Sequence, residues 1–372
     1  MTLPSASAIG GAERPVSTDP PIRLMIVDDS PIARTILSRM ISNQQGLEVV
    51  ALAASAGEAI NGLQRMQVDI VLLDVEMPGT SGLAALPEIL RKGRGAHVIV
   101  VSSQCEDGAE AAVQALALGA ADTLPKPGTG TFGGRFSEIL AERLRRIGRA
   151  RQNVDSPIIN SASPSDSLPI SLRELTNCRL GCVSLGASTG GLHALSDFLR
   201  GLPPVIGAPI LVTQHLPPVF MPFFTRQIEL ASGRTSRVAE DGAILLAEQI
   251  LVAPGDAHIG LERIGNRVEV RLSQAPASSG CMPSVDSMFW AVSDAYGKNA
   301  LGIVFSGMGR DGLVGSARLV DRGGTVLVQD QQTSAVWGMP RAVAEAGLAS
   351  AMLPPAELAC LVSARMKAGQ WR

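Results

Sequence analysis

Aromatic side chains are scarce in this chain of 372 residues, at 3% of the total, and positive charge is not in excess. There are 32 Lys and Arg against 34 Asp and Glu, which gives a formal net charge of -2. Proteins that bind nucleic acid usually carry a basic surface, and those that bind single strands add aromatic platforms for stacking. The composition therefore argues against nucleic acid as a partner.

Long apolar runs are lacking too. No run approaches the ~20 residues that a membrane-spanning helix needs, and residues 1–21 have neither the basic nor the apolar segment of a secretory signal. We therefore predict a cytoplasmic protein with no membrane insertion and interpret residues 1–21 as a disordered tail. The five cysteines are scattered, as is typical of reduced thiols. Cys178 and Cys182 are close together, but no second pair completes a zinc tetrahedron.

Two series of alternating apolar and amphipathic segments predict two α/β domains. In residues 22–147, the runs RLMIV, LEVVALAA, DIVLL, HVIVV and ADTL are strand-like, and helical patterns separate them. Five such units predict a doubly wound parallel sheet covered on both faces. Residues 148–178 are rich in Ser, Pro, Asn and Asp without any period, which is typical of a linker.

Residues 179–372 repeat this alternation in GCVSLG, APILVTQH, QILVAPGD, ALGIVFSG and GGTVLVQD. Within them AHIGLERIGNRVEVRL predicts a β-hairpin that turns at Gly265-Asn266. The expected fold is therefore α/β, with two doubly wound parallel-sheet domains, the second larger and carrying a hairpin.

Charged and hydroxyl side chains end four predicted strands of the first domain. Asp28 and Asp29 end the first strand and Asp74 the third, and these two strands flank the switch point where such sheets bind ligands. Three converging carboxylates repel each other unless a hard cation binds them, and Mg²⁺ suits such oxygen ligands. Ser102 and Lys126 end the fourth and fifth strands. Polar residues commonly gather at strand ends, but the five together predict a phosphoryl-accepting site with Asp74 as nucleophile.

These residues resemble the receiver domain of bacterial response regulators, over about residues 22–147. The resemblance implies a flavodoxin-like fold with Asp74 as phosphoacceptor and Asp28, Asp29 and Asp74 as the Mg²⁺ site. It also implies that Ser102 is the switch hydroxyl and that Lys126 contacts the phosphoryl group. After EMP, the sequence GTSG departs from the family's more usual ending, in a loop that bears on partner surface more than on chemistry.

The stretch GCVSLGASTGGLHAL, residues 181–195, joins an apolar run to a glycine-rich turn and a helical pattern. A Walker-type phosphate loop needs Lys followed by Ser or Thr after its last glycine, and a dinucleotide fingerprint needs G-x-G-x-x-G; neither is present. The segment fits G-x-S-x-G, which exposes a serine at a strand–helix turn. Ser188 is therefore a candidate nucleophile, although Gly-Ser turns also occur in many loops without catalytic roles.

A nucleophilic serine needs a base and an orienting acid. His215 follows the strand-like run PILVT and is expected on the same sheet edge as Ser188. Asp311 lies in the glycine-rich loop after LGIVFSG, on that edge as well. Taken singly, a hydrogen-bonded strand-end histidine and a helix N-cap aspartate are the more ordinary interpretations, but with Ser188 they favour a triad. The other three histidines fit the role less well: His97, His193 and His258.

The blocks GASTGG, QHLPP, VAPGD, PSVD, SGMGRDG and WGMPR resemble the catalytic domain of the chemotaxis protein-glutamate methylesterases of the CheB type, over residues 180–350. The resemblance implies Ser188 as nucleophile, His215 as general base, Asp311 as its orienting partner and an oxyanion site at the backbone near Met308 and Thr189. It implies hydrolysis of γ-glutamyl methyl esters of chemoreceptors and deamidation of receptor glutamines, with no cofactor. A histidine autokinase would be the phosphodonor to the receiver.

One departure and one alternative accompany this resemblance. GCMPSVD carries Cys281 and Met282 where the family usually has His and Arg, and we expect both to shape the substrate groove.

The alternative function is a regulator that acts by binding only, as a scaffold or phosphate sink with an inactive triad. Since the linker is long, we also predict that the unphosphorylated receiver partly covers the triad cleft and that phosphorylation relieves this.

Overall fold

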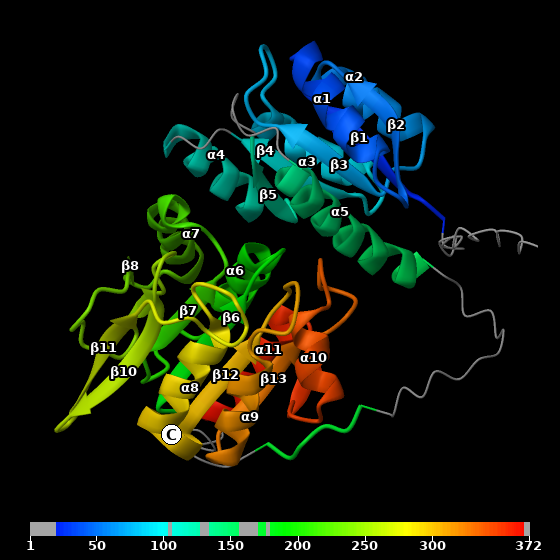
Figure 1. Ribbon diagram of the computed structural model, residues 1–372. Helices are drawn as coiled ribbons and strands as arrows, with labels where there is room; N and C mark the ends of the chain where they lie inside the picture. The colour runs from blue at the N-terminus through cyan, green and yellow to red at the C-terminus, as the bar shows by residue number, and fades with distance from the viewer. Residues whose placement is uncertain (1–19, 103–105, 127–133, 156–169, 176–178, 368–372) are drawn as a thin grey trace, which may run out of the picture.

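The computed structural model describes residues 20–102, 106–126, 134–155, 170–175 and 179–367. Nearly all of the predicted tail and much of the predicted linker lie outside the described residues. The described residues form two α/β domains stacked on one another (Figure 1). Within these ranges, no helix is both long enough and apolar enough to cross a membrane.

The first domain is a parallel five-stranded sheet with helices on both faces (Figure 1). Its elements are β1 (Ile22–Val27), α1 (Pro31–Ser42), β2 (Leu47–Ala53), α2 (Ala56–Arg65), β3 (Ile70–Asp74), α3 (Gly82–Lys92), β4 (His97–Ser102), α4 (Glu106–Ala117), β5 (Asp122–Pro125) and α5 (Gly134–Asp155). The strand order is β2-β1-β3-β4-β5, which places β1 beside β3 as the acidic cluster requires. Leu37 of α1 and Leu144 of α5 pack on one face, and Leu63, Leu86 and Val113 of α2, α3 and α4 on the other.

Serine side chains begin three of these helices. Ser30, Ser55 and Ser81 each accept a hydrogen bond from the backbone N–H three residues further on, at the start of α1, α2 and α3. Such caps satisfy N–H groups that have no partner inside the helix. They fix where each helix begins after its strand, and so they fix the loops in which Asp28 and Asp74 end their strands.

Helix α5 is longer than the sequence predicts. The pattern indicates an end near Ile147, and residues 148–178 are predicted as linker, but the helix continues to Asp155. Gly148 lies inside this helix, and Ile22 packs against it: a Cβ at Gly148 would lie 2.5 Å from Ile22 Cγ2. The close approach of β1 therefore favours glycine here without breaking the helix.

The second domain is a seven-stranded parallel sheet with an added hairpin. Its strands are β6 (Cys182–Ala187), β7 (Ile210–Gln214), β8 (Ser236–Val238), β9 (Ile250–Val252), β10 (His258–Ile264), β11 (Arg267–Ser273), β12 (Ala300–Val304), β13 (Thr325–Gln329) and β14 (Ala351–Leu353). Its helices are α6 (Gly191–Gly201), η1 (Pro218–Phe220), α7 (Met221–Ser232), α8 (Val285–Tyr296), η2 (Gly297–Asn299), α9 (Leu313–Asp321), α10 (Met339–Glu345) and α11 (Pro355–Lys367). The sheet order is β14-β13-β12-β6-β7-β9-β8, and β10 pairs antiparallel with β11.

The expected fold class is confirmed, including the hairpin turn, in which Gly265 takes a φ of 59°. The edge strands β8 and β14 were not predicted. Each has three residues, which is too short to show a period of two. The carboxyl ends of the central strands β12, β6 and β7 lie along one edge of the sheet. The loops that follow these strands carry Asp311, Ser188 and His215.

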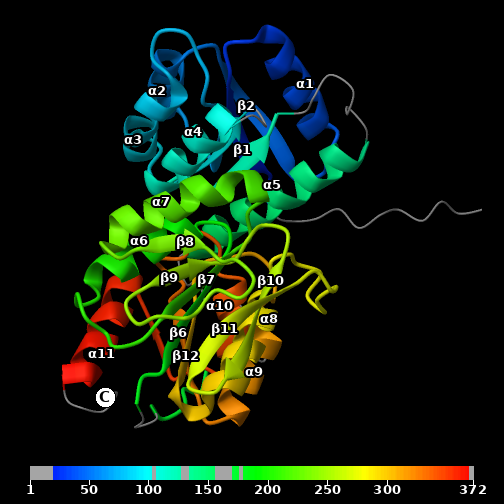
Figure 2. The same ribbon diagram turned by 90° about the vertical axis from the view of Figure 1, so that its left-hand side faces the viewer.

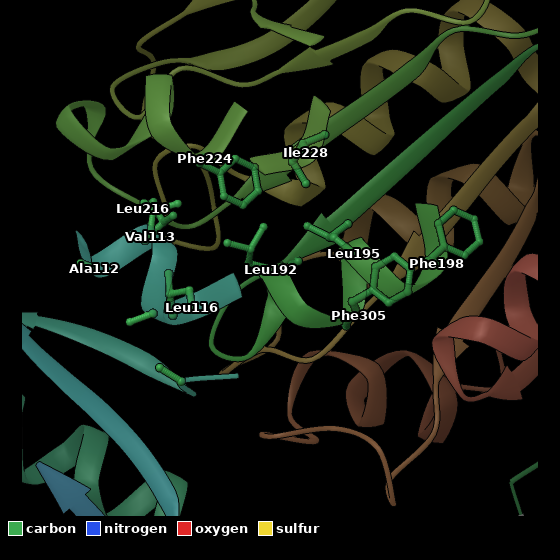
Figure 3. Packing of buried hydrophobic residues seen from close by; sticks show 14 of the residues in the cluster. Ala112, Val113, Leu116, Leu192, Leu195, Phe198, Leu216, Phe224, Ile228 and Phe305 are labelled. Atoms are coloured by element: carbon green, nitrogen blue, oxygen red, sulfur yellow. The ribbon is translucent and has the colours of Figure 1, made fainter. Parts of the chain in front are cut away.

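The two domains dock through apolar side chains. Helix α4 of the first domain contacts α6, η1 and α7 of the second, and α5 lies across the boundary (Figures 1 and 2). Val113 and Leu116 of α4 belong to the same buried cluster as Leu192, Leu216 and Phe224 of the second domain (Figure 3). Burial of apolar surface is the main driving force of such association, so the receiver is held over the second domain by a shared core.

Candidate active site

Ser188 stands in the turn between β6 and α6. Its N–H donates to Ser306 O at 3.0 Å, and its carbonyl accepts from Gln214 Nε2 at 2.8 Å. Gly190 begins α6 with a φ of 76°, and a Cβ there would come within 2.5 Å of Ala335 Cβ. Left-handed φ and this close approach both require glycine at position 190.

His215 and Asp311 form a hydrogen-bonded pair. His215 follows β7, and Asp311 lies in the loop between β12 and α9; His215 Nε2 is 2.8 Å from Asp311 Oδ2. The same carboxylate also accepts from Ser284 Oγ and from three backbone N–H groups, those of Val285, Asp286 and Gly312. Two of those N–H groups open α8. The ordinary interpretation of Asp311 as a helix cap is therefore partly right, but the helix is α8, not α9.

The ionisation of this pair follows from those contacts. Burial by itself would raise the pKa of Asp311, but the hydrogen bond and charge of His215 and the backbone N–H groups hold it well below its usual range. Burial lowers the pKa of His215, but the hydrogen bonds and charges of Asp311 and Cys281 outweigh burial and raise it to about 9. These contacts favour the protonated form of the imidazole.

Ser188, His215 and Asp311 line one cavity of about 830 Å³, together with Thr189 and Met308. The structure therefore brings together every esterase residue that the sequence singles out. In the described part of the chain no hydrogen bond joins the Ser188 and His215 side chains. Catalytic contacts of this kind often tighten only when substrate binds.

Side chains of the receiver line the same cavity. The sequence predicts that the receiver partly covers the triad cleft, but it does not identify which receiver residues do so. Asp122 Oδ2 accepts from Thr189 Oγ1 at 3.1 Å, and Ala121 O accepts from Gly190 N–H at 2.7 Å. Arg143 Nη1 lies 3.5 Å from Asp122 Oδ2, and burial raises the pKa of the Asp122 carboxyl. The first domain therefore contacts the turn that carries Ser188. No local motif marks Asp122, which opens β5 at the opposite end from Lys126.

Cys281 lies beside the histidine and not merely along the groove. Its Sγ, a ring nitrogen of His215 and a carboxylate oxygen of Asp311 are all within 4.8 Å of one another. Met282 lines the same cavity and is 40% exposed.

The other three histidines lie outside this cavity. His97 begins β4, and His193 is exposed, with its Nε2 3.5 Å from Asp197 Oδ2. His258 is buried, and its ring nitrogens bond to Ser284 N–H and Ala275 O.

The acidic site of the first domain is assembled as the strand ends predict. Carboxylate oxygens of Asp28, Asp29 and Asp74 lie within 4.8 Å of one another. Lys126 Nζ is 2.7 Å from Asp74 Oδ2. Ser102 Oγ is buried and has no hydrogen-bond partner among the described residues. This donor set of hard oxygens fits Mg²⁺, and the Ser102 hydroxyl ends the neighbouring strand β4.

Burial governs the electrostatics of this second site. It raises the pKa of Asp28 and of Asp74. Burial lowers the pKa of Lys126, but the hydrogen bond and charge of Asp74 raise it overall. The carboxyl groups of Asp28 and Asp74 have lost hydration, and the Lys126 ammonium is held in its charged form. Because the buried carboxylates are poorly hydrated, we expect the site to bind an additional cation.

Comparisons with known proteins agree with both resemblances. Residues 183–362 match the family model of the CheB methylesterase, and residues 24–131 match that of the response regulator receiver domain. Receiver domains use Mg²⁺ in phosphorylation.

Curated relatives span nearly the whole chain. A protein of Paramagnetospirillum magneticum named protein-glutamate methylesterase/protein-glutamine glutaminase 1 is 37% identical over 360 residues, which cover 91% of this chain and 94% of that protein. A protein of the same name from Rhodospirillum rubrum is 36% identical over 367 residues, covering 92% and 94%. Among solved structures, the CheB methylesterase catalytic domain of Thermotoga maritima is 32% identical, with a TM-score of 0.48, and covers 50% of this chain and 97% of that chain. The identity to the curated relatives over nearly the whole chain shows that it belongs to the CheB family and is a protein-glutamate methylesterase that carries a response-regulator receiver domain.

Proposed function

We propose that Ser188, His215 and Asp311 hydrolyse γ-glutamyl methyl esters, and deamidate glutamines, on chemoreceptors, under the control of phosphorylation at Asp74. The observation that carries this proposal is the shared cavity, which is lined both by a serine in a glycine-rich turn and by a histidine bonded to a buried carboxylate. The relatives' names supply the substrate class. A binding-only regulator would have no need of this arrangement.

The hydrogen bond between His215 and Asp311 supports the following division of roles in the triad. Nε2–H of His215 donates to Asp311, so Nδ1 is the ring nitrogen left to take the proton of Ser188 Oγ. Oγ then attacks the ester carbonyl, and His215 returns the proton to the methoxide oxygen, which leaves as methanol. Water repeats the sequence on the acyl-enzyme and releases the glutamate carboxyl group and the free serine. With a glutamine substrate the leaving group is ammonia.

The oxyanion formed in each step needs N–H donors. In the turn of residues 188–191, the N–H groups of Ser188, Gly190 and Gly191 already donate to backbone carbonyls. That leaves the Thr189 N–H, and both Thr189 and Met308 line the cavity. The backbone of Thr189 and of Met308 is the oxyanion site that we propose.

The receiver site fits phosphoryl transfer from a histidine autokinase. Asp28, Asp29 and Asp74 would hold Mg²⁺, which when bound offsets charge on the phosphoryl oxygens. Asp74 accepts hydrogen bonds from Lys126 and from Glu76 N–H, which leaves lone pairs on both oxygens for that chemistry. Lys126 lies next to β5. A phosphoryl group on Asp74 carries about −1.5 to −2 charges, in place of the single negative charge of the carboxylate. The phosphoaspartate would draw Lys126 and the Ser102 hydroxyl toward it.

The contacts between the domains support control by the receiver. Asp122, at the start of β5, and Arg143 border the esterase cavity, so a bulky receptor helix meets the receiver before it meets Ser188. Lys126 follows the other end of the same short strand. A shift of β5 on phosphorylation would therefore act on the bonds of Ala121 and Asp122 to the serine turn. Regulation then requires that the phosphorylated receiver docks less tightly.

Methanol release from methylated receptor membranes tests the proposal. Ser188→Ala and His215→Ala should each lower turnover by several orders of magnitude, because triad members act as a unit. His193→Ala is the matched control, since that histidine is exposed and outside the cavity. A serine-directed covalent probe should label the wild type and not Ser188→Ala. Full turnover in Ser188→Ala would support the binding-only alternative or another nucleophile.

A further inference from the structure

The esterase cavity holds a sulphur atom for which ester hydrolysis has no use. Cys281 is half-buried on the cavity wall, and its Sγ lies within 4.8 Å of both a His215 ring nitrogen and an Asp311 oxygen. Its loop is fixed: Cys281 N–H donates to Ser279 Oγ at 3.3 Å, and Sγ is 3.9 Å from Ser279 O. A thiol, an imidazole and a carboxylate are thus presented together to a cavity open to ions.

Thiolate and neutral imidazole are the ligands that Zn²⁺ favours, at about 2.3 Å for sulphur and about 2.0–2.1 Å for nitrogen. In tetrahedral coordination these bonds place the two ligand atoms about 3.5 Å apart. The sulphur and a ring nitrogen of His215 lie within 4.8 Å of each other, so they must approach to about this separation when a cation binds. Soft ligands of this kind do not suit Mg²⁺ or Ca²⁺, which bind to oxygen.

Asp311 would orient the histidine of such a site through a hydrogen bond. A histidine that binds a metal usually donates its other ring N–H to a carboxylate, which fixes the ring and its tautomer. Here His215 Nε2 is already 2.8 Å from Asp311 Oδ2, so Nδ1 is the nitrogen left for the cation. Asp311 accepts five hydrogen bonds in all and is therefore better placed to orient the histidine than to coordinate.

We propose that His215 and Cys281 bind Zn²⁺, with water in the remaining coordination positions, and that bound Zn²⁺ switches the esterase off. The cation would occupy the nitrogen that takes the proton of Ser188, so metal binding and ester hydrolysis exclude each other. The binding step stands on the geometry alone. The inhibition rests on the proposed role of His215 as the base.

Cobalt offers a readout that does not depend on activity. The full chain, with excess Mg²⁺ to fill the oxygen-ligand site of Asp28, Asp29 and Asp74, is titrated with Co²⁺. A thiolate-to-cobalt charge-transfer band should appear with a stoichiometry of one, and Zn²⁺ should remove it. Cys281→Ser should lose the band, while Cys360→Ser, which changes an exposed free cysteine elsewhere, should keep it.

Inhibition is measured in parallel on a small ester, as the ratio of rates with and without Zn²⁺ for each variant. The wild type and Cys360→Ser should be inhibited, with activity restored by EDTA. Cys281→Ser should need at least about 100-fold more Zn²⁺, because loss of a direct ligand exceeds the cost of losing an outer partner. Ser188→Ala should still give the cobalt band although it is inactive.

The two failures can be told apart. A band that persists in Cys281→Ser, or equal Zn²⁺ sensitivity in Cys281→Ser and the wild type, overturns the metal site. A Cys281-dependent band without inhibition overturns the switch and also the role of His215 in the proposed function, while the binding site stands. A Cys281-dependent band with inhibition supports both.

Discussion

Asp74 and Asp311 are both buried at the centre of their sites, but their surroundings differ in kind. Asp74 accepts from one ammonium and one backbone N–H, whereas Asp311 accepts from His215, a serine hydroxyl and three backbone N–H groups. Burial raises the pKa of Asp74, while at Asp311 the hydrogen bonds and the charge of His215 overcome burial and lower it.

The contrast separates a carboxylate that reacts from one that holds a neighbour in place. Asp74 keeps lone pairs free and a charge that is poorly compensated, so it gains from binding a cation and from bonding to phosphorus. The lone pairs of Asp311 accept hydrogen bonds, and these bonds and the charge of His215 stabilise its carboxylate. Asp311 therefore stays ionised and keeps its position.

The largest effect should be at the reacting carboxylate. Acetyl phosphate with Mg²⁺ should label the chain at Asp74, and Asp74→Asn should abolish the labelling while turnover of a small ester is kept. The change is nearly isosteric and removes a charge that burial disfavours, so the fold should survive. Chelation of Mg²⁺ is the control and should also abolish labelling. Stable phosphate in Asp74→Asn would mean that another residue accepts it.

The corresponding Asp→Asn substitution at Asp311 should lower ester hydrolysis and leave phosphorylation intact. Asp311→Asn should lower kcat for ester hydrolysis by about 10⁴-fold, because an amide no longer fixes the histidine tautomer. Its amide also cannot accept from all five donors, so the midpoint of thermal unfolding should fall as well. Labelling by acetyl phosphate should continue. An Asp311→Asn variant with near-normal kcat would show that Asp311 only caps α8.

The pH dependence should report the charge that Asp311 and Cys281 stabilise on His215. A pKa of about 9 keeps the imidazole protonated at neutral pH, and only the neutral ring can take the serine proton. Turnover of a small ester, measured with EDTA present, should therefore rise about tenfold per pH unit up to roughly pH 9. Cys281→Ser removes one cause of the raised pKa and should shift the rise to lower pH. A profile flat from pH 6 to 9 would contradict this assignment.

The sequence predicted those parts of the molecule that local pattern determines. Asp28, Asp74 and Lys126 could be placed together because carboxyl ends of parallel strands share one edge, and the serine turn has its own glycine signature. The Asp122–Thr189 contact could not be found, because it depends on how two finished surfaces dock. Cys281 was placed in the groove, but its approach to the histidine depends on the path of a loop that has no period.

The smallest effect concerns that docking contact. Asp122 is the receiver side chain that bonds the serine turn, through Thr189 Oγ1 at 3.1 Å. A hydrogen bond to a charged group contributes about 1.5–3 kcal/mol, but the apolar contacts of α4 with the esterase domain persist in a variant at this position. Asp122→Ala should therefore raise the unphosphorylated full chain's activity on receptor membranes several-fold, and only part of the way to that of residues 178–372 alone.

Turnover of a small ester is the control for both chains, because such a substrate reaches the cavity without moving the receiver and should change far less. Residues 178–372 alone should also ignore phosphodonors. Asp122→Ala could match the wild type while the shortened chain is activated. That result would mean that the apolar contacts of α4 cause the inhibition and that the Asp122–Thr189 bond does not contribute to it. If the shortened chain and the unphosphorylated full chain acted equally on receptors, the receiver would not restrain the esterase by covering it.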